Sequence, residues 1–252
     1  MEQGGEGPDL LLMLHGMGAT GAVWSPLCAD MRTGASARWQ GRWLAPDLPG
    51  HGRSAAQRSY AIGQHAASVA RAVLPHIQPG GRLVVLWHSL GGVIALALAT
   101  GWFGLVPHRV FAAGIKIAWS DEEVQRMDSL ALQPAKLFPT ETQAQERYLK
   151  VSGLAAVAGA ASPVAARGVA REGDGWRLAM DPRANAVGKP PLSELMALAR
   201  CPVHLARGGN DAMVTLAQTR SLDADARDLG PHGHNVMVEA PAQVLDWMAS
   251  FS

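Results

Sequence analysis

The sequence predicts an α/β protein with a mostly parallel central sheet and helices on both faces. Short uncharged runs rich in β-branched and large apolar residues alternate along the chain with longer segments whose apolar residues recur at helical spacing. Loops rich in glycine and proline separate the two kinds of segment. Strands that alternate with helices pair in parallel and are covered on both faces, which explains why the apolar runs are continuous.

The N-terminal half supplies three of the expected strands and three helices. Each expected strand is a short apolar run that ends at a loop, at residues 9–14, 43–45 and 83–87. The helices are expected at residues 24–31, 60–77 and 93–99. The first nine residues are polar, acidic and rich in glycine, so we expect a frayed tail there and not a signal peptide.

The C-terminal half contains two further expected strands, a final helix and an insertion. The strands are expected at residues 109–118 and 202–206, and the helix at residues 241–251, with a proline at its start. Residues 120–191 are more charged and rich in alanine, and they contain no run typical of a strand. This segment predicts a helical cap of about 70 residues, inserted into a core domain made of residues 1–119 and 192–252.

The charge of the chain is balanced. It has 22 basic and 21 acidic residues and a formal net charge of +1, which argues against nucleic acid or a membrane surface as a partner and favours a small neutral molecule. The longest uncharged stretch, residues 83–107, is interrupted by glycines, which favours a strand, a turn and a buried helix over a membrane span. Cys28 and Cys201 are far apart in the sequence, as is typical of a cytoplasmic protein without a disulfide framework. Nothing in the sequence indicates an oligomeric state.

Three loops carry side chains suited to nucleophilic catalysis. Ser89 follows the strand at 83–87, Asp211 follows the strand at 202–206, and His234 precedes the last helix. Ligands of open parallel sheets bind beyond the carboxyl ends of the strands, so we expect these side chains to meet there. A serine hydroxyl is a poor nucleophile at neutral pH unless an imidazole takes its proton and a carboxylate orients that imidazole. The sequence therefore predicts Ser89 as nucleophile, His234 as base and Asp211 as acid.

Four segments of the chain resemble the α/β-hydrolase superfamily. In chain order they are LHGMGATGAVW, APDLPGHGRS, HSLGG and GHNVMVEAP, and the resemblance extends over residues 9–119 and 192–251. It implies that Ser89 lies on the nucleophile elbow of the superfamily, whose pattern is G-x-S-x-G. It also implies an oxyanion hole made by the backbone amides of Met17 and Leu90. A serine nucleophile indicates acyl transfer, since relatives that act on haloalkanes and epoxides use a carboxylate.

One position departs from the pattern of the elbow, because Trp87 stands where the superfamily usually has glycine. We interpret Trp87 as a core residue that fills space beside the elbow. Two alternatives to the proposed base and acid are His232, two residues from His234, and Asp121, which follows the strand at 109–118. His234 is favoured because it belongs to the GHN element, and Asp211 is favoured by its loop.

The resemblance limits the reaction more than the substrate. It implies a carboxylesterase or lactonase that acts on a small, fairly apolar ester, with a carbon–carbon bond hydrolase and a ligand-binding protein of little turnover as alternatives. The cap is expected to roof the site, with Trp119, Leu137 and Phe138 as candidate substrate contacts. The remaining histidines do not cluster with cysteines or acidic residues at ligand spacing, and no nucleotide-binding glycine pattern follows a strand. We therefore expect neither a metal nor another cofactor.

Overall fold

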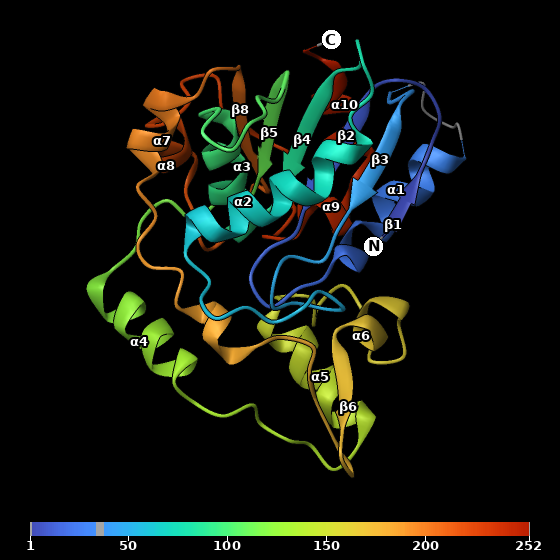
Figure 1. Ribbon diagram of the computed structural model, residues 1–252, viewed down its shortest axis with the longest axis vertical. Coiled ribbons are helices and arrows are strands. Elements are labelled where there is room, and N and C mark those ends of the chain that lie inside the picture. Colours follow the sequence, from blue (N-terminus) through green and yellow to red (C-terminus); the bar gives the residue numbers. More distant parts are fainter. Residues whose placement is uncertain (1, 34–37, 252) are drawn as a thin grey trace.

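The computed structural model describes residues 2–33 and 38–251 and confirms the predicted α/β fold (Figure 1). Within these residues the central sheet has the strand order β1-β3-β2-β4-β5-β8-β9. Its strands are β1 (Glu2–Gly4), β2 (Leu10–Leu14), β3 (Arg42–Ala45), β4 (Leu83–Trp87), β5 (Arg109–Ala113), β8 (Val203–Arg207) and β9 (Arg227–Asp228). β1 pairs antiparallel with β3, and every other pairing in this sheet is parallel.

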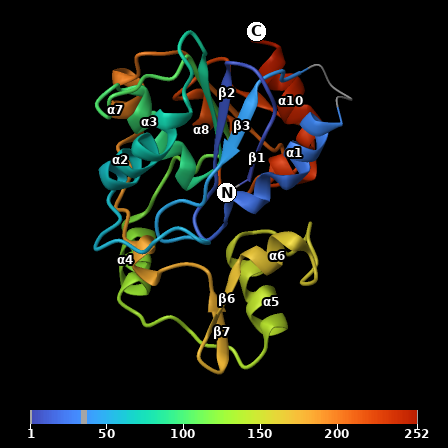
Figure 2. The same ribbon diagram turned by 45° about the vertical axis from the view of Figure 1, so that its right-hand side comes forward.

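Helices cover both faces of the sheet. They are α1 (Ser25–Arg32), α2 (Ile62–Val73), α3 (Leu90–Ala99), α7 (Leu192–Leu198), α8 (Leu216–Arg220), α9 (Val236–Glu239) and α10 (Pro241–Ala249). α1 packs with α9 and α10 on one face, while α3 packs with α2 and α7 on the other, and Figure 2 shows the sheet between these two groups. Among the described residues, no helix is both long enough and apolar enough to cross a bilayer.

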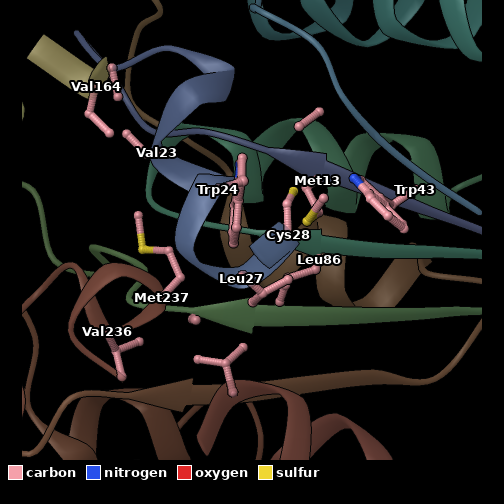
Figure 3. Packing of buried hydrophobic residues seen from close by; sticks show 14 of the residues in the cluster. Met13, Val23, Trp24, Leu27, Cys28, Trp43, Leu86, Val164, Val236 and Met237 are labelled. Carbon is pink, nitrogen blue, oxygen red and sulfur yellow. The ribbon is translucent and has the colours of Figure 1, made fainter. Parts of the chain in front are cut away.

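The core consists of two apolar layers, one on each face of the sheet. Because side chains alternate along a strand, Leu11 and Met13 of β2 enter the layer beneath α1 and α10, whereas Leu12 and Leu14 enter the layer beneath α2 and α3. Figure 3 shows the first layer, in which Met13 lies near Trp24 and Cys28. Both faces of the strands are thus buried, as the continuous apolar runs predicted.

The segment between β5 and β8 lies below the sheet in Figure 1, and we call residues 120–191 the cap segment. It contains α4 (Asp121–Ala131), α5 (Glu141–Val151), α6 (Pro163–Arg167), β6 (Val169–Glu172), β7 (Gly175–Leu178) and a 3-10 turn (Pro182–Asn185). The expectation that it is entirely helical is wrong, because β6 and β7 pair as an antiparallel hairpin. Two residues join the strands, and Gly173 adopts a φ of 56°, which suits such a tight hairpin turn.

The cap segment is fastened to the core by backbone pairing at its C-terminal part. The amide of Gly52 donates to the carbonyl of Ala179 at 2.6 Å, and the amide of Asp181 donates to the carbonyl of Gly50 at 2.7 Å. Between α4 and α5 the chain runs through a long loop in which Leu132 is 85% exposed. The part of the cap segment that follows β7 is therefore bonded to the core, while most residues of the loop before α5 are exposed.

Two further expectations needed correction. The N-terminal tail was expected to fray, but residues 2–4 form β1, because a sheet edge offers backbone hydrogen bonds that require no apolar side chains. The strand expected at 109–118 ends at Ala113, because Gly114 has a φ of 75° and turns the chain out of the sheet. The other expected strands agree with β2, β3, β4 and β8 to within about two residues, the usual uncertainty of element ends.

Trp87 is a core residue, as predicted from the sequence. Its side chain is fully buried in the layer beneath α2 and α3. The ring lies against Gly92 in the first turn of α3, where a Cβ atom would stand 1.6 Å from a ring carbon. Trp87 therefore takes the space that a side chain at position 92 would need, and the large residue before the elbow is accommodated by a glycine after it.

We predict that Trp87→Ala lowers the free energy of unfolding by about 3–5 kcal/mol, the usual cost of truncating a large buried aromatic residue. The matched control is Trp102→Ala, because Trp102 is 67% exposed, and its effect should stay within about 0.5 kcal/mol. Urea unfolding followed by circular dichroism measures both. Gly92→Ala should destabilise the wild type strongly but the Trp87→Ala variant much less; equal effects in the two backgrounds would contradict the packing described here.

Candidate active site

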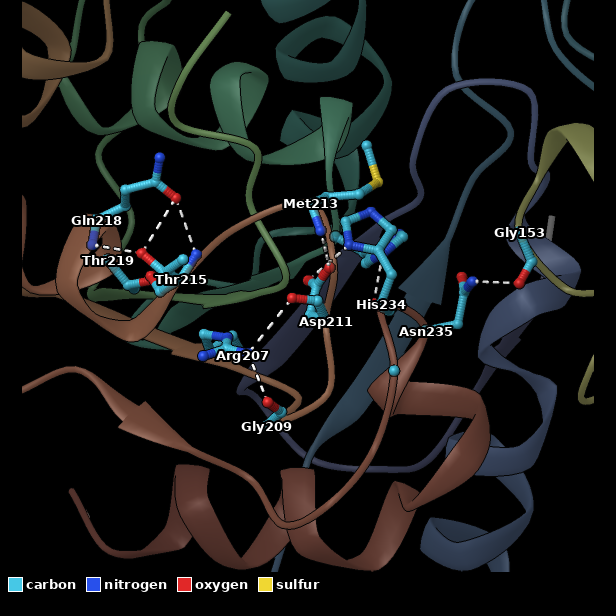
Figure 4. A network of polar contacts seen from close by, with 12 residues as sticks. Gly153, Arg207, Gly209, Asp211, Met213, Thr215, Gln218, Thr219, His234 and Asn235 are labelled. Carbon is cyan, nitrogen blue, oxygen red and sulfur yellow. Dashed lines mark hydrogen bonds and ion pairs between the residues drawn. The ribbon is translucent and has the colours of Figure 1, made fainter.

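Three loops bring Ser89, Asp211 and His234 to the end of the sheet that faces the cap segment. Ser89 links β4 to α3, Asp211 follows β8, and His234 lies just before α9. The strands β4, β5 and β8 are neighbours in the sheet and run parallel, so that their carboxyl ends lie side by side. Figure 4 shows the Asp211 and His234 side chains in contact.

Ser89 has a strained backbone. Its φ of 51° makes it the non-glycine residue with a positive φ among residues 2–33 and 38–251, and its ψ is −117°. Such a conformation costs on the order of 1–3 kcal/mol and persists where the surroundings enforce it. Here the Ser89 amide donates to the carbonyl of Gly114 at 3.1 Å, and a Cβ atom at Gly16 would lie 2.9 Å from the Ser89 Cβ. The serine is thus held between two loops.

Asp211 and His234 form a hydrogen bond. Nδ1 of His234 lies 2.8 Å from Oδ2 of Asp211, whose side chain is fully buried. Oδ1 of the same carboxylate accepts from the amide of Met213 at 2.8 Å. Because an ionised carboxylate only accepts hydrogen bonds, Nδ1 of His234 carries the proton and Nε2 has a free lone pair. The pair therefore presents a basic nitrogen.

Ser89 and His234 both border Gly114, and no hydrogen bond joins them in the part of the chain that the structure describes. Gly114 lies against both of them: its carbonyl accepts from the Ser89 amide, and a Cβ atom there would lie 3.4 Å from Nδ1 of His234. Hydrogen bonds of catalytic groups are often long in a site without substrate and shorten when substrate binds. A proton transfer from Ser89 to His234 therefore stays a prediction.

Arg207, which was not predicted from the sequence, supports the loop that carries Asp211. Its Nη2 donates to the carbonyl of Gly209 at 2.6 Å and lies 3.4 Å from the carbonyl of Asp211. Its Nη1 forms an ion pair with Asp228 at 3.4 Å. A charged residue at the end of a buried strand was the available signal, since such residues are rarely buried without partners.

His88 lies beneath His234. Its Nε2 is 3.0 Å from the carbonyl oxygen of His234, and the two rings are 4.5 Å apart. A carbonyl oxygen only accepts, so Nε2 of His88 carries the proton. Complete burial, and then the nearby His234, lower the pKa of His88 well below its usual value. His88 is therefore a neutral donor that fixes the backbone of the residue proposed as base.

The backbone amides of Met17 and Leu90 are both available as donors. Neither donates a hydrogen bond to any residue within the described ranges. Leu90 is the first residue of α3, where amides lack partners within the helix and the helix dipole favours negative charge. The loop that contains Met17 is held by a hydrogen bond, because the Gly18 amide donates to Nε2 of His51 at 3.2 Å.

His15 and His51 shape this loop as neutral acceptors. Nε2 of His15 accepts from the amide of Leu48 at 2.8 Å, and its Nδ1 donates to the carbonyl of Gly16 at 2.8 Å. Burial lowers the pKa of His15 to about 3 and that of His51 to about 4. Both rings must stay neutral to accept from a backbone amide, so a structural role, as expected from the sequence, accounts for them.

The alternative base and acid lie elsewhere. Asp121 begins α4, and its side chain is 88% exposed near Lys189. Nδ1 of His232 lies 3.9 Å from a carboxylate oxygen of Glu239. The structure therefore pairs Asp211 with His234, and neither Asp121 nor His232 takes part in this pair.

The candidate substrate contacts lie in the cap segment or directly before it. Trp119 lies where the cap segment begins, and its Nε1 donates to the carbonyl of Lys116 at 3.1 Å. Phe138 exchanges two backbone hydrogen bonds with Trp176 of β7, and Leu137 is 53% exposed. Within the described residues none of the three has a hydrogen bond to Ser89 or His234, and their contact with substrate stays a prediction. No group of three His, Cys, Asp or Glu side chains in that part of the chain could hold a metal ion.

The chain belongs to the alpha/beta hydrolase family, whose profile matches residues 11–247. A dihydrolipoyllysine-residue acetyltransferase component of an acetoin cleaving system from Pseudomonas putida is 28% identical over 99% of this chain and 65% of its own length. A pimeloyl-[acyl-carrier protein] methyl ester esterase from Vibrio cholerae is 40% identical over 38% of this chain and 32% of its own length. The chain thus spans from about a third to two thirds of these curated relatives.

Solved structures show the same fold at low identity. An esterase of Mycobacterium tuberculosis superposes with a TM-score of 0.76 at 20% identity, covering 97% of this chain and 86% of the esterase. An E-2-(acetamidomethylene)succinate hydrolase superposes with a TM-score of 0.74 at 19% identity, covering 98% of this chain and 92% of that one. These likenesses establish the fold.

We predict that Asp211→Asn lowers kcat for an activated ester about 10⁴-fold, because an amide that donates to Nδ1 favours the wrong tautomer of His234. The matched control is Asp121→Asn, which makes the same change on an exposed side chain and should leave kcat within about twofold, since surface substitutions are usually near neutral. Steady-state kinetics on both purified variants measures the effect. The opposite ranking would assign the acid to Asp121.

We also predict that the protein loses stability in mild acid. Unfolded histidine binds a proton near pH 6.5, but folded His51 does so only at about pH 4 and folded His15 at about pH 3. Below pH 6.5 the unfolded state binds more protons, so the free energy of unfolding falls as the pH is lowered. The His51 contribution levels off near pH 4 and the His15 contribution near pH 3. At pH 5 each of these two histidines lowers the free energy of unfolding by about 2 kcal/mol.

Urea unfolding between pH 7 and pH 5 tests this expectation. His51→Gln, which cannot titrate, should show a smaller loss over that range than the wild type, whatever its stability at pH 7. His108→Gln, at an exposed histidine, is the matched control. An identical pH dependence in the wild type and in His51→Gln would refute the assignment.

Proposed function

We propose that the protein is a serine hydrolase that cleaves a small, fairly apolar carboxylic ester or lactone through an acyl-enzyme intermediate. The observation that carries this proposal is the 2.8 Å bond between Nδ1 of His234 and Asp211, beside a serine with a φ of 51°. A buried carboxylate, an imidazole with a free nitrogen and a serine at the start of a helix are what acyl transfer requires.

In this mechanism Oγ of Ser89 attacks the carbonyl carbon of the ester while its proton passes to Nε2 of His234. Asp211 stabilises the imidazolium that forms, and the amides of Met17 and Leu90 donate to the oxyanion. The tetrahedral intermediate collapses, His234 protonates the leaving alkoxide, and Ser89 remains acylated. Water then attacks the acyl group with His234 again as base, which releases the carboxylic acid and restores the serine.

Ester chemistry is favoured by the named relatives. The curated proteins similar to this chain include a lipase of Mycobacterium tuberculosis and the methyl ester esterase described above, and one of the similar structures is an esterase. Cys28 and Cys201 are both free, in keeping with the cytoplasmic location that we expect. The size and polarity of the substrate are inferred from the balanced charge of the chain.

We predict that Ser89→Ala removes nearly all ester hydrolysis, about 10⁶-fold in kcat, as loss of a triad nucleophile does. A panel of p-nitrophenyl esters of increasing acyl length, lactones and vinylogous diketones measures turnover in the wild type. A fluorophosphonate should label the wild type at Ser89 and leave Ser89→Ala unlabelled.

The outcomes separate the alternatives. Turnover of the diketones but not of the esters would favour a carbon–carbon bond hydrolase, and slow labelling without turnover of any substrate would favour a ligand-binding protein. Full activity in folded Ser89→Ala would refute the nucleophile. A circular dichroism spectrum of the variant that matches the wild type guards against simple misfolding.

A further inference from the structure

The residue that follows His234 reaches from the core to the cap segment. Asn235 is 3% exposed, and its Nδ2 donates to the carbonyl of Gly153 at 3.0 Å and to that of Ser152 at 3.3 Å. Figure 4 shows the first of these bonds. Because both partners are carbonyl oxygens, which only accept, the side chain must turn its amide nitrogen toward them. Both protons of Nδ2 are therefore donated to carbonyl oxygens of the cap segment.

The two carbonyls belong to the end of α5. Ser152 is the C-terminal cap of this helix, and the last carbonyls of a helix have no acceptor role within it. Asn235 completes the helix end from a position 83 residues away in the chain. The negative end of the helix dipole favours a donor here and disfavours a carboxylate. An amide side chain is thus the residue type that this junction needs.

The backbone of Asn235 is fixed as well. Its carbonyl accepts from the amides of Val238 and Glu239, at 2.8 and 3.1 Å, and so begins α9. The carbonyl of His234, one peptide unit earlier, accepts from Nε2 of His88 at 3.0 Å. His234 therefore lies between an anchor in the core and an anchor on the cap segment, and the Asn235 side chain is the second of these.

The same helix end also borders the loop of Met17. A Cβ atom at Gly18 would lie 3.8 Å from the carbonyl oxygen of Val151, the last residue of α5. The end of α5 therefore contacts the loop of the proposed base and lies against the loop of a proposed oxyanion donor. The position of α5 relative to the core therefore affects both of these loops.

We propose that Asn235 is a positioning residue, which sets His234 against Ser89 and Asp211 by tying its loop to the end of α5. The proposal rests on the proposed function. It makes the cap segment part of the catalytic apparatus, because a displacement of α5 would move the base. Asn235 touches neither substrate nor the reacting atoms and acts through His234.

The test uses Asn235→Asp, which keeps the shape but replaces both protons by a charge that α5 disfavours, and Asn235→Ala, which removes the contact. We expect kcat per active site to fall about 10²-fold in Asn235→Asp and at least tenfold in Asn235→Ala, because small misplacements of a catalytic group cost such factors. KM should change little. Active sites are counted by titration with a fluorophosphonate, so that kcat is calculated from the concentration of folded, reactive protein alone.

The control is Asn185→Asp, because the Asn185 amide also donates to a backbone carbonyl, that of Pro182, but within the cap segment. It should keep wild-type kcat. A second readout is the far-downfield proton resonance of the His234–Asp211 bond, assigned by its loss in Asp211→Asn. We expect it to shift or broaden in both Asn235 variants and not in the control.

A kcat per active site within twofold of wild type in Asn235→Ala, with the resonance unchanged, would overturn the proposal, and so would a loss of activity explained wholly by fewer titrated sites. Should Asn235→Asp not fold, Asn235→Ala and Asn235→Ser, which keeps a shorter polar side chain, decide the question. A wild type that hydrolyses no ester would refute the proposed function, while the resonance would still show whether Asn235 positions His234.

Discussion

The hydrogen bond between His234 and Asp211 depends on two loops, 23 residues apart in the chain, being held at one end of the sheet. Neither loop is held by regular secondary structure at these positions. Arg207 donates to the carbonyls of the Asp211 loop, and His88 and Asn235 hold the His234 loop from the core and from the cap segment. Each of these contacts is a side-chain donor on a backbone carbonyl. The geometry of the site is therefore set by buried polar groups, which fix distances more tightly than apolar packing does.

Burial also explains why the histidines around the site are neutral. His15, His51 and His88 are buried, and burial lowers the pKa of each. A neutral ring offers one donor and one acceptor, so that His15 and His51 can accept from backbone amides while they donate to carbonyls. Because these neighbours carry no charge, the carboxylate of Asp211 acts on His234 without competing cations from the histidines.

The sequence predicted the parts of the site that depend on the chain order of strands and loops. Ser89 and Asp211 could be named because each follows an apolar run, and His234 because it belongs to the GHN element before the last helix. Trp87 could be assigned to the core because it ends an apolar run. The supports could not be named, since Asn235 bonds to residues 82 and 83 positions away and nothing local indicates its partners. The β6–β7 hairpin was missed because its strands are short and largely polar, and β1 because it adds to a sheet edge through its backbone.

The open loop between α4 and α5 has a consequence for how the molecule could be divided. Leu132 and Leu137 in this loop are 85% and 53% exposed, whereas the pairing of Ala179 and Asp181 with the core lies beyond it in the chain. A chain divided in this loop would give two polypeptides, one with Ser89 and the other with Asp211 and His234. Strands of both pieces pair in the central sheet, since β5 precedes the loop and β8 follows it. Neither piece would hold all three of the proposed catalytic residues, so the proposed activity would require the two pieces to reassemble.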